Sequence, residues 1–328
     1  MVAIIPVAGI GSRLRPHTFS IHKVLITVAG KPIIDYIIDE LLSVGIKKII
    51  FITGHLGEQI QNHVTKKYGN TKGRRFSFVE QKEQKGLAHA IYMAKELVSA
   101  KEDVLIVLGD TVFKMNLQEI VDNPASVLGV KKVKDPRRFG IVVKKGKFAK
   151  QLIEKPENPI SNLALVGLYK ITNSTLLWEA IEELFDKKLK TKNEFQLTDA
   201  LQIMLDKKEK MEIMEIENWF DCGKPETLLS TNRELLSLHS KKQKIEGNLI
   251  IPPVYIDKTA KVNKSIIGPF VTIGKNVEIE NSIIADAIVE NNASVKNINL
   301  KTSLIGARAL VVGKPNRLNI SDSTEVEF

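Results

Sequence analysis

Apolar and polar residues alternate in blocks along the first third of the chain, and the blocks predict strands and helices in turn. Val2–Val7 is an apolar run that stops at a glycine-rich segment, and Ile33–Leu42 places aliphatic residues at helical spacing after Pro32. Similar blocks predict strands over 47–53, 75–80 and 103–108, and helices over 58–68 and 87–99. Such alternation is typical of an α/β fold, in which helices cover both faces of a mostly parallel sheet.

The middle of the chain is less regular but contains the same two kinds of block. It predicts strands over 127–133, 141–144, 148–153 and 163–171, and helices over 174–184, 197–205 and 228–238. In open sheets of this kind, ligands bind beyond the carboxyl ends of the strands. Gly9–Arg13 and Gly109–Thr111 both follow predicted strand ends. We therefore expect these two segments to border one crevice.

The last part of the chain has a short repeat. From Ile256 onward, aliphatic or small residues recur in pairs four positions apart, and the pairs begin five or six positions apart. This repeat indicates a β-helix of roughly three coils, at about 18 residues for each coil. An ordinary antiparallel β-domain is the alternative, and the lack of hairpin turn dipeptides disfavours it. We therefore expect two domains, 1–240 and 241–328.

Composition restricts the class of protein. A chain of 328 residues, 43% hydrophobic and 26% charged, is globular rather than disordered or fibrous. No apolar run approaches the roughly 18 residues of a membrane span, and the first residues lack the basic segment of a signal peptide. Cys222 is the single cysteine, which excludes an intramolecular disulfide and a cysteine-based zinc cluster. We expect a cytoplasmic protein.

The charge is unevenly distributed. The net charge is +10, from 48 Lys and Arg against 38 Asp and Glu. Residues 245–328 hold nine of each sign, so the whole excess lies in residues 1–244. Such an excess suits nucleic acid, an anionic membrane or an anionic small substrate. No basic run is interleaved with aromatic residues, so we expect a small anionic substrate, with neither nucleic acid nor membrane as partner.

A candidate phosphate loop follows the first predicted strand. It reads Ala8-Gly9-Ile10-Gly11-Ser12-Arg13, and Lys23 comes shortly afterwards. Glycines let backbone amides turn toward phosphate oxygens, and the cations neutralise those oxygens. The loop is not a Walker P-loop, since Gly-Lys-Ser/Thr is absent, and not the Rossmann fingerprint, since the third glycine is missing. Taken alone, the two glycines could equally well end a strand.

A family resemblance extends from this loop along nearly the whole chain. Residues 9–18, Lys23 and residues 29–36 resemble the opening of the sugar-1-phosphate nucleotidyltransferases, or NDP-sugar pyrophosphorylases. This family includes glucose-1-phosphate thymidylyltransferases and UTP–glucose-1-phosphate uridylyltransferases. Later motifs resemble the family in the same order: Gln81 with 86–90, 108–110, 139–142, 154–156, 162–169 and 219–223. The resemblance implies a Rossmann-like mixed sheet followed by a small left-handed β-helix of hexapeptide repeats.

The resemblance also implies the chemistry. A sugar 1-phosphate attacks the α-phosphorus of a nucleoside triphosphate in line, which gives an NDP-sugar and pyrophosphate, with magnesium (Mg²⁺) as cofactor. Asp110 and Asp221 would hold Mg²⁺, and Arg13 and Lys23 would be the catalytic cations that grip the triphosphate. The implied nucleotide-binding residues are Ala8, Gly9, Gly11, Ser12, Gln81 and Gly86, and the implied sugar-phosphate residues are Gly140, Glu154, Lys155 and Gly167.

Residues 86–88 resemble the pyrimidine-using branches of the family, so UTP or dTTP is the expected nucleotide. Glucose 1-phosphate is the default expectation for the sugar. Departures at His22, Thr27 and Thr111 bear on the nucleotide rather than on the reaction. The alternatives are a mannose-1-phosphate guanylyltransferase and a non-catalytic scaffold that binds sugar nucleotides. An acyltransferase on the β-helix is disfavoured, since such enzymes rely on a histidine base and no histidine follows His239. The flat sides of a β-helix favour a homo-oligomer.

Overall fold

The computed structural model describes residues 1–69, 73–239 and 243–314. These residues form two compact units. Unit 1 comprises Met1–Ile26 and Lys31–Leu228, and unit 2 comprises Thr27–Gly30 and Leu229–Phe328. The expected boundary between residues 240 and 241 lies outside the described residues. No helix in the described part of the chain has the length and apolar character needed to cross a membrane.

A nine-stranded mixed sheet forms the centre of unit 1, in the order β5-β4-β1-β6-β11-β8-β12-β10-β9. β1 (Val2–Val7), β4 (Lys48–Thr53), β5 (Arg75–Glu80) and β6 (Val104–Val107) are parallel, and β11 (Leu163–Ile171) is antiparallel to β6. The predicted α/β fold with a Rossmann-like mixed sheet is confirmed for this unit. The other strands of the sheet are β8 (Ser126–Lys132), β9 (Gly140–Lys145), β10 (Phe148–Glu154) and β12 (Met211–Glu215).

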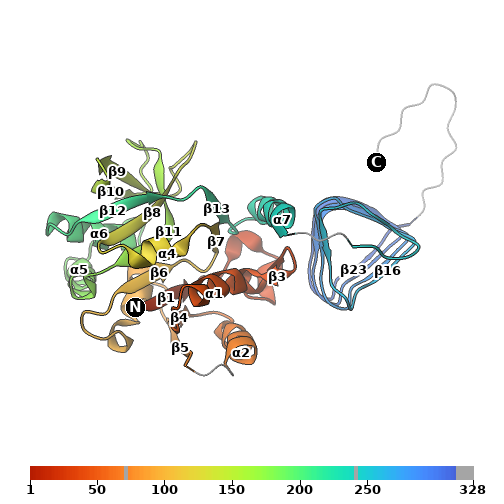
Figure 1. Cartoon of the computed structure of the whole chain (residues 1–328), viewed down its shortest axis with the longest axis horizontal. Coiled ribbons are helices and arrows are strands. Elements are labelled where there is room, and N and C mark those ends of the chain that lie inside the picture. The colour runs from red at the N-terminus through yellow and green to blue at the C-terminus, as the bar shows by residue number, and fades with distance from the viewer. Residues whose placement is uncertain (70–72, 240–242, 315–328) are drawn as a thin grey trace. The chain divides into compact units, whose positions relative to one another are not determined.

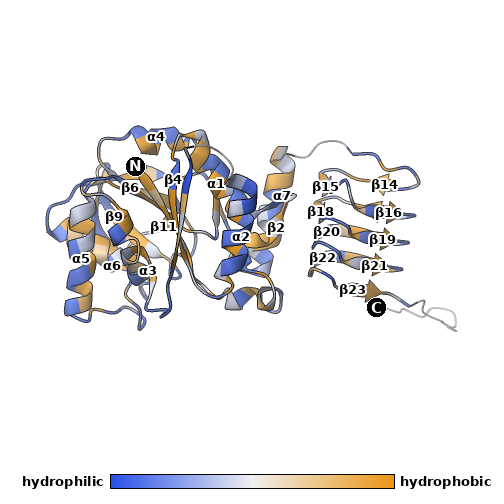
Figure 2. Ribbon diagram, turned by 90° about the horizontal axis from the view of Figure 1, so that it is seen from below, coloured by the Kyte–Doolittle hydropathy of each residue, from blue (hydrophilic) through white to orange (hydrophobic). Residues whose placement is uncertain are grey.

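Helices cover both faces of this sheet, as Figures 1 and 2 show. One face carries α1 (Ile33–Ser43), α2 (Gly57–Tyr68) and α4 (Leu117–Asp122), and the other carries α3 (Leu87–Tyr92), α5 (Ser174–Asp186) and α6 (Leu197–Asp206). α7 (Pro225–His239) continues from unit 1 into unit 2. Short elements complete unit 1: η1 (Ser12–Leu14), η2 (His17–Phe19), η3 (Lys23–Leu25), η4 (Lys95–Leu97), β3 (Lys31–Pro32), β7 (Thr111–Lys114) and β13 (Asn218–Asp221).

Side chains of the central strands alternate between two cores. On β1, Ile4 packs into the core shared with α3, α5 and α6, whereas Ala3 and Ile5 pack into the core shared with α1, α2 and α4. All three side chains are fully buried. Burial of one isoleucine contributes about 1.5–3 kcal/mol. A sheet covered on both faces needs apolar residues at odd and even positions alike, because successive side chains point to opposite faces. This explains why the strand is an uninterrupted apolar run rather than an alternating one.

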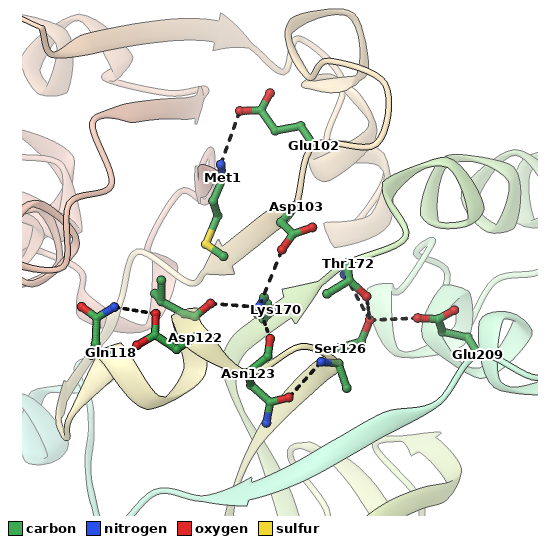
Figure 3. Close-up of polar contacts among 12 residues, drawn as sticks. Met1, Glu102, Asp103, Gln118, Asp122, Asn123, Ser126, Lys170, Thr172 and Glu209 are labelled. Carbon is green, nitrogen blue, oxygen red and sulfur yellow. Dashed lines mark hydrogen bonds and ion pairs between the residues drawn. The ribbon is translucent and has the colours of Figure 1, made fainter.

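A buried charge lies near the amino end of β6, whereas the glycine loop lies beyond the carboxyl end of the neighbouring strand β1. Lys170 of β11 is only 3% exposed. Its Nζ donates to the carbonyl of Val121 at 2.9 Å and to that of Asn123, and lies 3.6 Å from Asp103 (Figure 3). Val121 lies in the last turn of α4, where orphan carbonyls favour a cation. Lys170 therefore caps this helix from inside the protein.

The predicted helix over 87–99 is wrong in its second half. α3 ends at Tyr92, and the chain continues through the separate turn η4. The N–H groups of Ala94 and Leu97 bond three residues back, to Ile91 and Ala94. Such bonds tighten the chain into 3-10 geometry, and runs of this geometry stay short.

Unit 2 consists mainly of short parallel strands in two sheets, ordered β14-β17-β20-β18-β15, with β22 paired to β20, and β16-β19-β21-β23. Val254 pairs with Val271, 17 residues on, and Val271 pairs with Ala287, 16 residues on, which corrects the expected coil of about 18 residues. The strands stack with a triangular outline in Figure 1, compatible with a β-helix. They are β14 (Leu249–Ile250), β15 (Val254–Ile256), β16 (Lys261–Asn263), β17 (Ile266–Ile267), β18 (Val271–Ile273), β19 (Glu278–Glu280), β20 (Ile283–Val289), β21 (Ser294–Lys296), β22 (Asn299–Ile305) and β23 (Leu310–Val312). β2 (Thr27–Val28) is assigned to the same unit but lies outside both sheets.

Asparagines occupy turns between these strands. Asn276, Asn281, Asn292 and Asn297 all have positive φ, a conformation that asparagine tolerates better than most residues. Their side chains also bond across successive levels, since the amide of Asn276 donates to Asn292 at 3.2 Å and that of Asn281 to Asn297 at 3.2 Å. The repeat therefore fixes its turns as well as its valine- and isoleucine-rich core.

Candidate functional site

A cavity of about 420 Å³ opens at the carboxyl ends of β1 and β6 in unit 1. Ala8 and Gly9, directly after β1, line one side, and Asp110, shortly after β6, lines the floor with Leu108. Gly140, at the start of β9, lines the side formed by the antiparallel strands. The expected crevice therefore exists, and it lies between the parallel strands β1 and β6 and the antiparallel pair β9 and β10.

The glycine loop turns sharply at Gly11. This residue has φ of 70° and precedes η1, which carries Arg13. Thr18 Oγ1 donates to the Gly11 carbonyl at 2.8 Å and ties the loop to η2. A Cβ on Gly11 would approach Thr18 Cγ2 to 3.0 Å, so the position needs glycine for space as well as for conformation.

Lys23 and Asp110 form a close ion pair at the edge of the cavity. Their Nζ and Oδ2 atoms are 2.6 Å apart, and the side chains are 16% and 21% exposed. Burial alone would raise the pKa of Asp110, but the Lys23 ammonium outweighs it, so the pKa is lowered and the carboxylate stays charged. His22 holds the turn that carries Lys23, since its Nδ1 accepts from the Val24 N–H at 3.3 Å. Burial lowers the pKa of His22 to about 4, which keeps the ring neutral.

A second carboxylate, Asp221, is held beside this pair. β13 pairs with β7 so that Asp221 lies opposite Thr111, and the Cys222 N–H donates to the Asp110 carbonyl at 3.0 Å. Burial raises the pKa of Asp221, and the charge of Asp110 raises it further. The two carboxylates are therefore electrostatically coupled.

Arg13 lies on the far side of Gly223. A Cβ on Gly223 would stand 2.8 Å from an Arg13 guanidinium nitrogen and 2.8 Å from Asp221 Oδ1. The Arg13 charge opposes the rise in the pKa of Asp221. Glycine at position 223 therefore lets this cation reach the carboxylates.

This donor set fits Mg²⁺. No group of three or more His, Cys, Asp or Glu side chains with metal-binding geometry occurs among residues 1–69, 73–239 and 243–314. Mg²⁺ is usually held by one or two carboxylates, with substrate phosphates and water completing the shell. Asp110 and Asp221 together supply that number of hard oxygen ligands.

The opposite side of the cavity carries a hydrogen-bonded carboxylate. Thr198 Oγ1 donates to Glu154 Oε2 at 2.6 Å, and Lys155 Nζ lies 3.0 Å from Glu154 Oε1. A Cβ on Gly140 would stand 2.7 Å from Thr198 Oγ1 and 3.0 Å from Glu154 Oε2. Any larger residue at position 140 would displace this pair. Gly167, with φ of 83°, packs on Leu108 behind the cavity.

A basic cavity of about 610 Å³ adjoins the first and shares Arg138 and Lys155 with it. Arg13, Arg137 and Lys192 complete its cationic lining, against the single carboxylate of Glu157. Such a cluster attracts phosphate groups. The sequence analysis missed Arg137, Arg138 and Lys192, although the two arginines directly precede the motif at 139–142.

The structure brings most of the expected site residues together. The first cavity is lined by Ala8, Gly9, Lys23, Gln81, Gly86, Asp110, Gly140, Glu154 and Lys155, and the second by Arg13 and Lys155. Gly11, Ser12, Gly167 and Asp221 lie next to these residues in the elements described above. Three further lining residues, Phe139, Leu165 and Tyr169, lie within the motifs at 139–142 and 162–169, although the sequence analysis gave them no role. The lining residues that it did not name are Gln84, Glu194, Gln196 and Thr198.

Comparison with known proteins shows the family to which this chain is similar. Residues 2–237 match the family described as Nucleotidyl transferase. The low-salt glycan biosynthesis nucleotidyltransferase of Haloferax volcanii is 35% identical over 253 residues, 74% of this chain and 68% of that protein. The UTP–glucose-1-phosphate uridylyltransferase of the same organism is 30% identical over 236 residues, 69% of this chain and 93% of that protein.

A longer relative and two solved structures extend this comparison. The bifunctional protein GlmU of Methanocaldococcus jannaschii is 36% identical, and the match spans 59% of its length. A UDP-glucose pyrophosphorylase structure from Acinetobacter baumanii has a TM-score of 0.61 at 26% identity, over 73% of this chain and 94% of that one. A UDP-glucose pyrophosphorylase complexed with UDP-glucose has a TM-score of 0.62 at 24% identity, over 73% and 99%, a likeness of fold alone.

Proposed function

Because this chain belongs to the nucleotidyl transferase family and is a sugar-phosphate nucleotidyltransferase, we propose that it makes an NDP-sugar and pyrophosphate from UTP or dTTP and glucose 1-phosphate. The observation that carries the proposal is the cavity of about 420 Å³ in unit 1. Its one side presents the glycine loop, Lys23 and Asp110, and its other side presents Glu154 and Lys155. Two anionic substrates can therefore meet there with cations on both sides.

The proposed reaction needs positioning rather than a protein nucleophile. An oxygen of the sugar phosphate attacks the α-phosphorus in line, and the bond to the β-phosphate oxygen breaks. Arg13 and Lys23 stabilise the leaving pyrophosphate, which requires Lys23 to exchange part of its contact with Asp110 for phosphate oxygens. When bound by Asp110 and Asp221, Mg²⁺ neutralises negative charge on the triphosphate.

The sugar phosphate occupies the side of Glu154 in this proposal. Glu154 accepts hydrogen bonds from sugar hydroxyls, and Lys155, with Arg138 and Lys192, binds the phosphate. Gly140 leaves the space that the Glu154 and Thr198 pair requires. The nucleotide lies along Ala8, Gly9, Gly11 and Ser12, with its base near Gln81 and Gly86.

We further propose that unit 2 is a left-handed β-helix of hexapeptide repeats and that the enzyme is a cytoplasmic homo-oligomer. The parallel strands with partners 16 or 17 residues apart support the β-helix. Mannose-1-phosphate guanylyltransferase activity is the second candidate among reactions, because the same cations would bind GTP and mannose 1-phosphate.

The test compares two single substitutions. Asp110→Asn is expected to lower pyrophosphate release from UTP, glucose 1-phosphate and Mg²⁺ by at least about a hundredfold, because it removes one of the two carboxylates that would hold Mg²⁺. Asp186→Asn, at the exposed end of α5, removes the same charge far from the cavity and is the matched control. Comparable loss in both variants, or full activity in Asp110→Asn, would contradict the proposal.

A further inference from the structure

The side-chain amide of Gln81 is held from behind by two acceptors. Gln81 follows β5, lines the cavity and is 5% exposed. Its Nε2 donates to the Gly86 carbonyl at 3.2 Å and to His89 Nδ1 at 2.9 Å. His89 lies on α3, behind Gln81. An amide nitrogen has two hydrogens, so these two bonds use both of them.

The two partners fix which way the amide points. A carbonyl can only accept, so the atom that faces Gly86 must be the nitrogen. With the amide reversed, two oxygens would face each other across this contact. Because an amide nitrogen can only donate, His89 Nδ1 accepts the second bond, and the single proton of the neutral ring lies on Nε2. Burial and the nearby Lys85 lower the pKa of His89, which favours this neutral ring.

The Oε1 atom of Gln81 is then the free end of the amide. No hydrogen bond to this atom occurs within the described part of the chain, and the residue lines the cavity on the side assigned to the nucleotide base. An acceptor at this point pairs with a ring N–H. Uracil and thymine carry such a donor at N3, and guanine carries one at N1. Cytosine presents a lone pair at N3, which an amide oxygen repels.

We propose that His89 is a positioning residue for base selection: it fixes the Gln81 amide with its oxygen toward the cavity, so that the site accepts UTP or dTTP and rejects CTP. The inference rests on the proposed function, because it assumes that the base lies at Gln81. His89 acts through Gln81, and its ring packs on Phe185 with centroids 6.1 Å apart.

Steady-state kinetics with UTP and CTP at saturating glucose 1-phosphate tests this role. The wild type is expected to favour UTP in kcat/KM by about a hundredfold or more, since a pocket that hydrogen-bonds one group discriminates strongly against its inverse. His89→Phe keeps an aromatic ring against Phe185 but removes the acceptor. It is expected to narrow the UTP to CTP ratio about tenfold, the size of one lost hydrogen bond. This loss is expected to appear mainly as a higher KM for UTP, while kcat stays within about twofold of the wild-type value.

Two further variants separate positioning from packing. His89→Gln restores an acceptor and is expected to keep the ratio within about twofold of the wild type. Phe185→Leu loosens the packing around His89 and leaves the acceptor, so its melting temperature falls while its ratio stays. A wild-type ratio in His89→Phe overturns the inference. So does a narrowed ratio in either His89→Gln or Phe185→Leu.

Failure of the proposed function would have a different signature. If the wild type turned over no substrate pair, calorimetric titration of UTP and CTP into each variant would still measure base selection. The same tenfold narrowing in binding would then support the role of His89, and equal binding of UTP and CTP by the wild type would overturn it.

Discussion

Replacement of Lys170 by methionine tests how the buried cap on α4 stabilises unit 1. Methionine keeps an unbranched stem of similar length and deletes the ammonium. The carbonyls of Val121 and Asn123 then lose their shared donor, and Asp103 loses its ion pair (Figure 3). The substitution therefore changes hydrogen bonding with little change in volume.

The expected cost follows from the two carbonyl partners. A hydrogen bond to a charged group contributes about 1.5–3 kcal/mol, and an orphaned buried acceptor costs about 1–3 kcal/mol. Relief from burying the charge offsets part of this loss. We expect Lys170→Met to destabilise unit 1 by about 2–4 kcal/mol, or roughly 5–10 °C in melting temperature for a unit of this size.

Thermal unfolding followed by circular dichroism measures the effect. Lys132→Met is the matched control, because Lys132 lies exposed on the neighbouring strand β8 and has the same charge. An exposed substitution is expected to change stability by less than about 0.5 kcal/mol. Equal melting temperatures for the two variants would refute the assignment of Lys170 as a cap.

Three other predictions concern charge, space and phosphate binding. Burial would raise the pKa of Asp35, but bonds from His63 and Lys67 lower it, so the carboxylate stabilises the fold above its unfolded pKa. Asp35→Asn should therefore lower urea stability at pH 7, and the deficit should shrink as pH falls below about 4; a deficit independent of pH would contradict this. Gly140→Ala should lower kcat/KM for the sugar phosphate at least about tenfold, because the added Cβ would stand 2.7 Å from Thr198 Oγ1. Unchanged kinetics would show that Thr198 moves aside without disturbing the site. Lys192→Ala should raise KM for the sugar phosphate about tenfold and leave KM for UTP unchanged. An equal rise in both KM values would contradict the assignment of Lys192 to the sugar phosphate.

The two segments that the strand pattern alone predicted to border one crevice share one physical feature. Gly9 and Asp110 each follow a parallel strand, and parallel strands present their carboxyl ends at one edge of the sheet. Local pattern therefore sufficed to bring them together. The same local patterns predicted most of the helices and strands of unit 1 to within a few residues. They missed β7, α4 and β12, and they made the helix over 87–99 too long.

The site residues that sequence reasoning missed depend on contacts between segments that are far apart in the chain. Thr198 reaches Glu154 across 44 positions, and Lys192 joins the basic cavity from a loop without a motif. The Thr27–Gly30 segment belongs to unit 2 because the Ala29 N–H donates to Asn232 Oδ1 at 2.8 Å, across 203 positions. No short-range pattern encodes such pairings.

The central claim is that the cavity of unit 1 joins a nucleotide to a sugar 1-phosphate. The most direct measurement is pyrophosphate release by the wild type with Mg²⁺, across UTP, dTTP, GTP, ATP and CTP against glucose, mannose, galactose and N-acetylglucosamine 1-phosphates. We predict one preferred pair, with UTP or dTTP as the nucleotide and glucose 1-phosphate as the sugar. Folded protein that releases no pyrophosphate with any pair would contradict the claim.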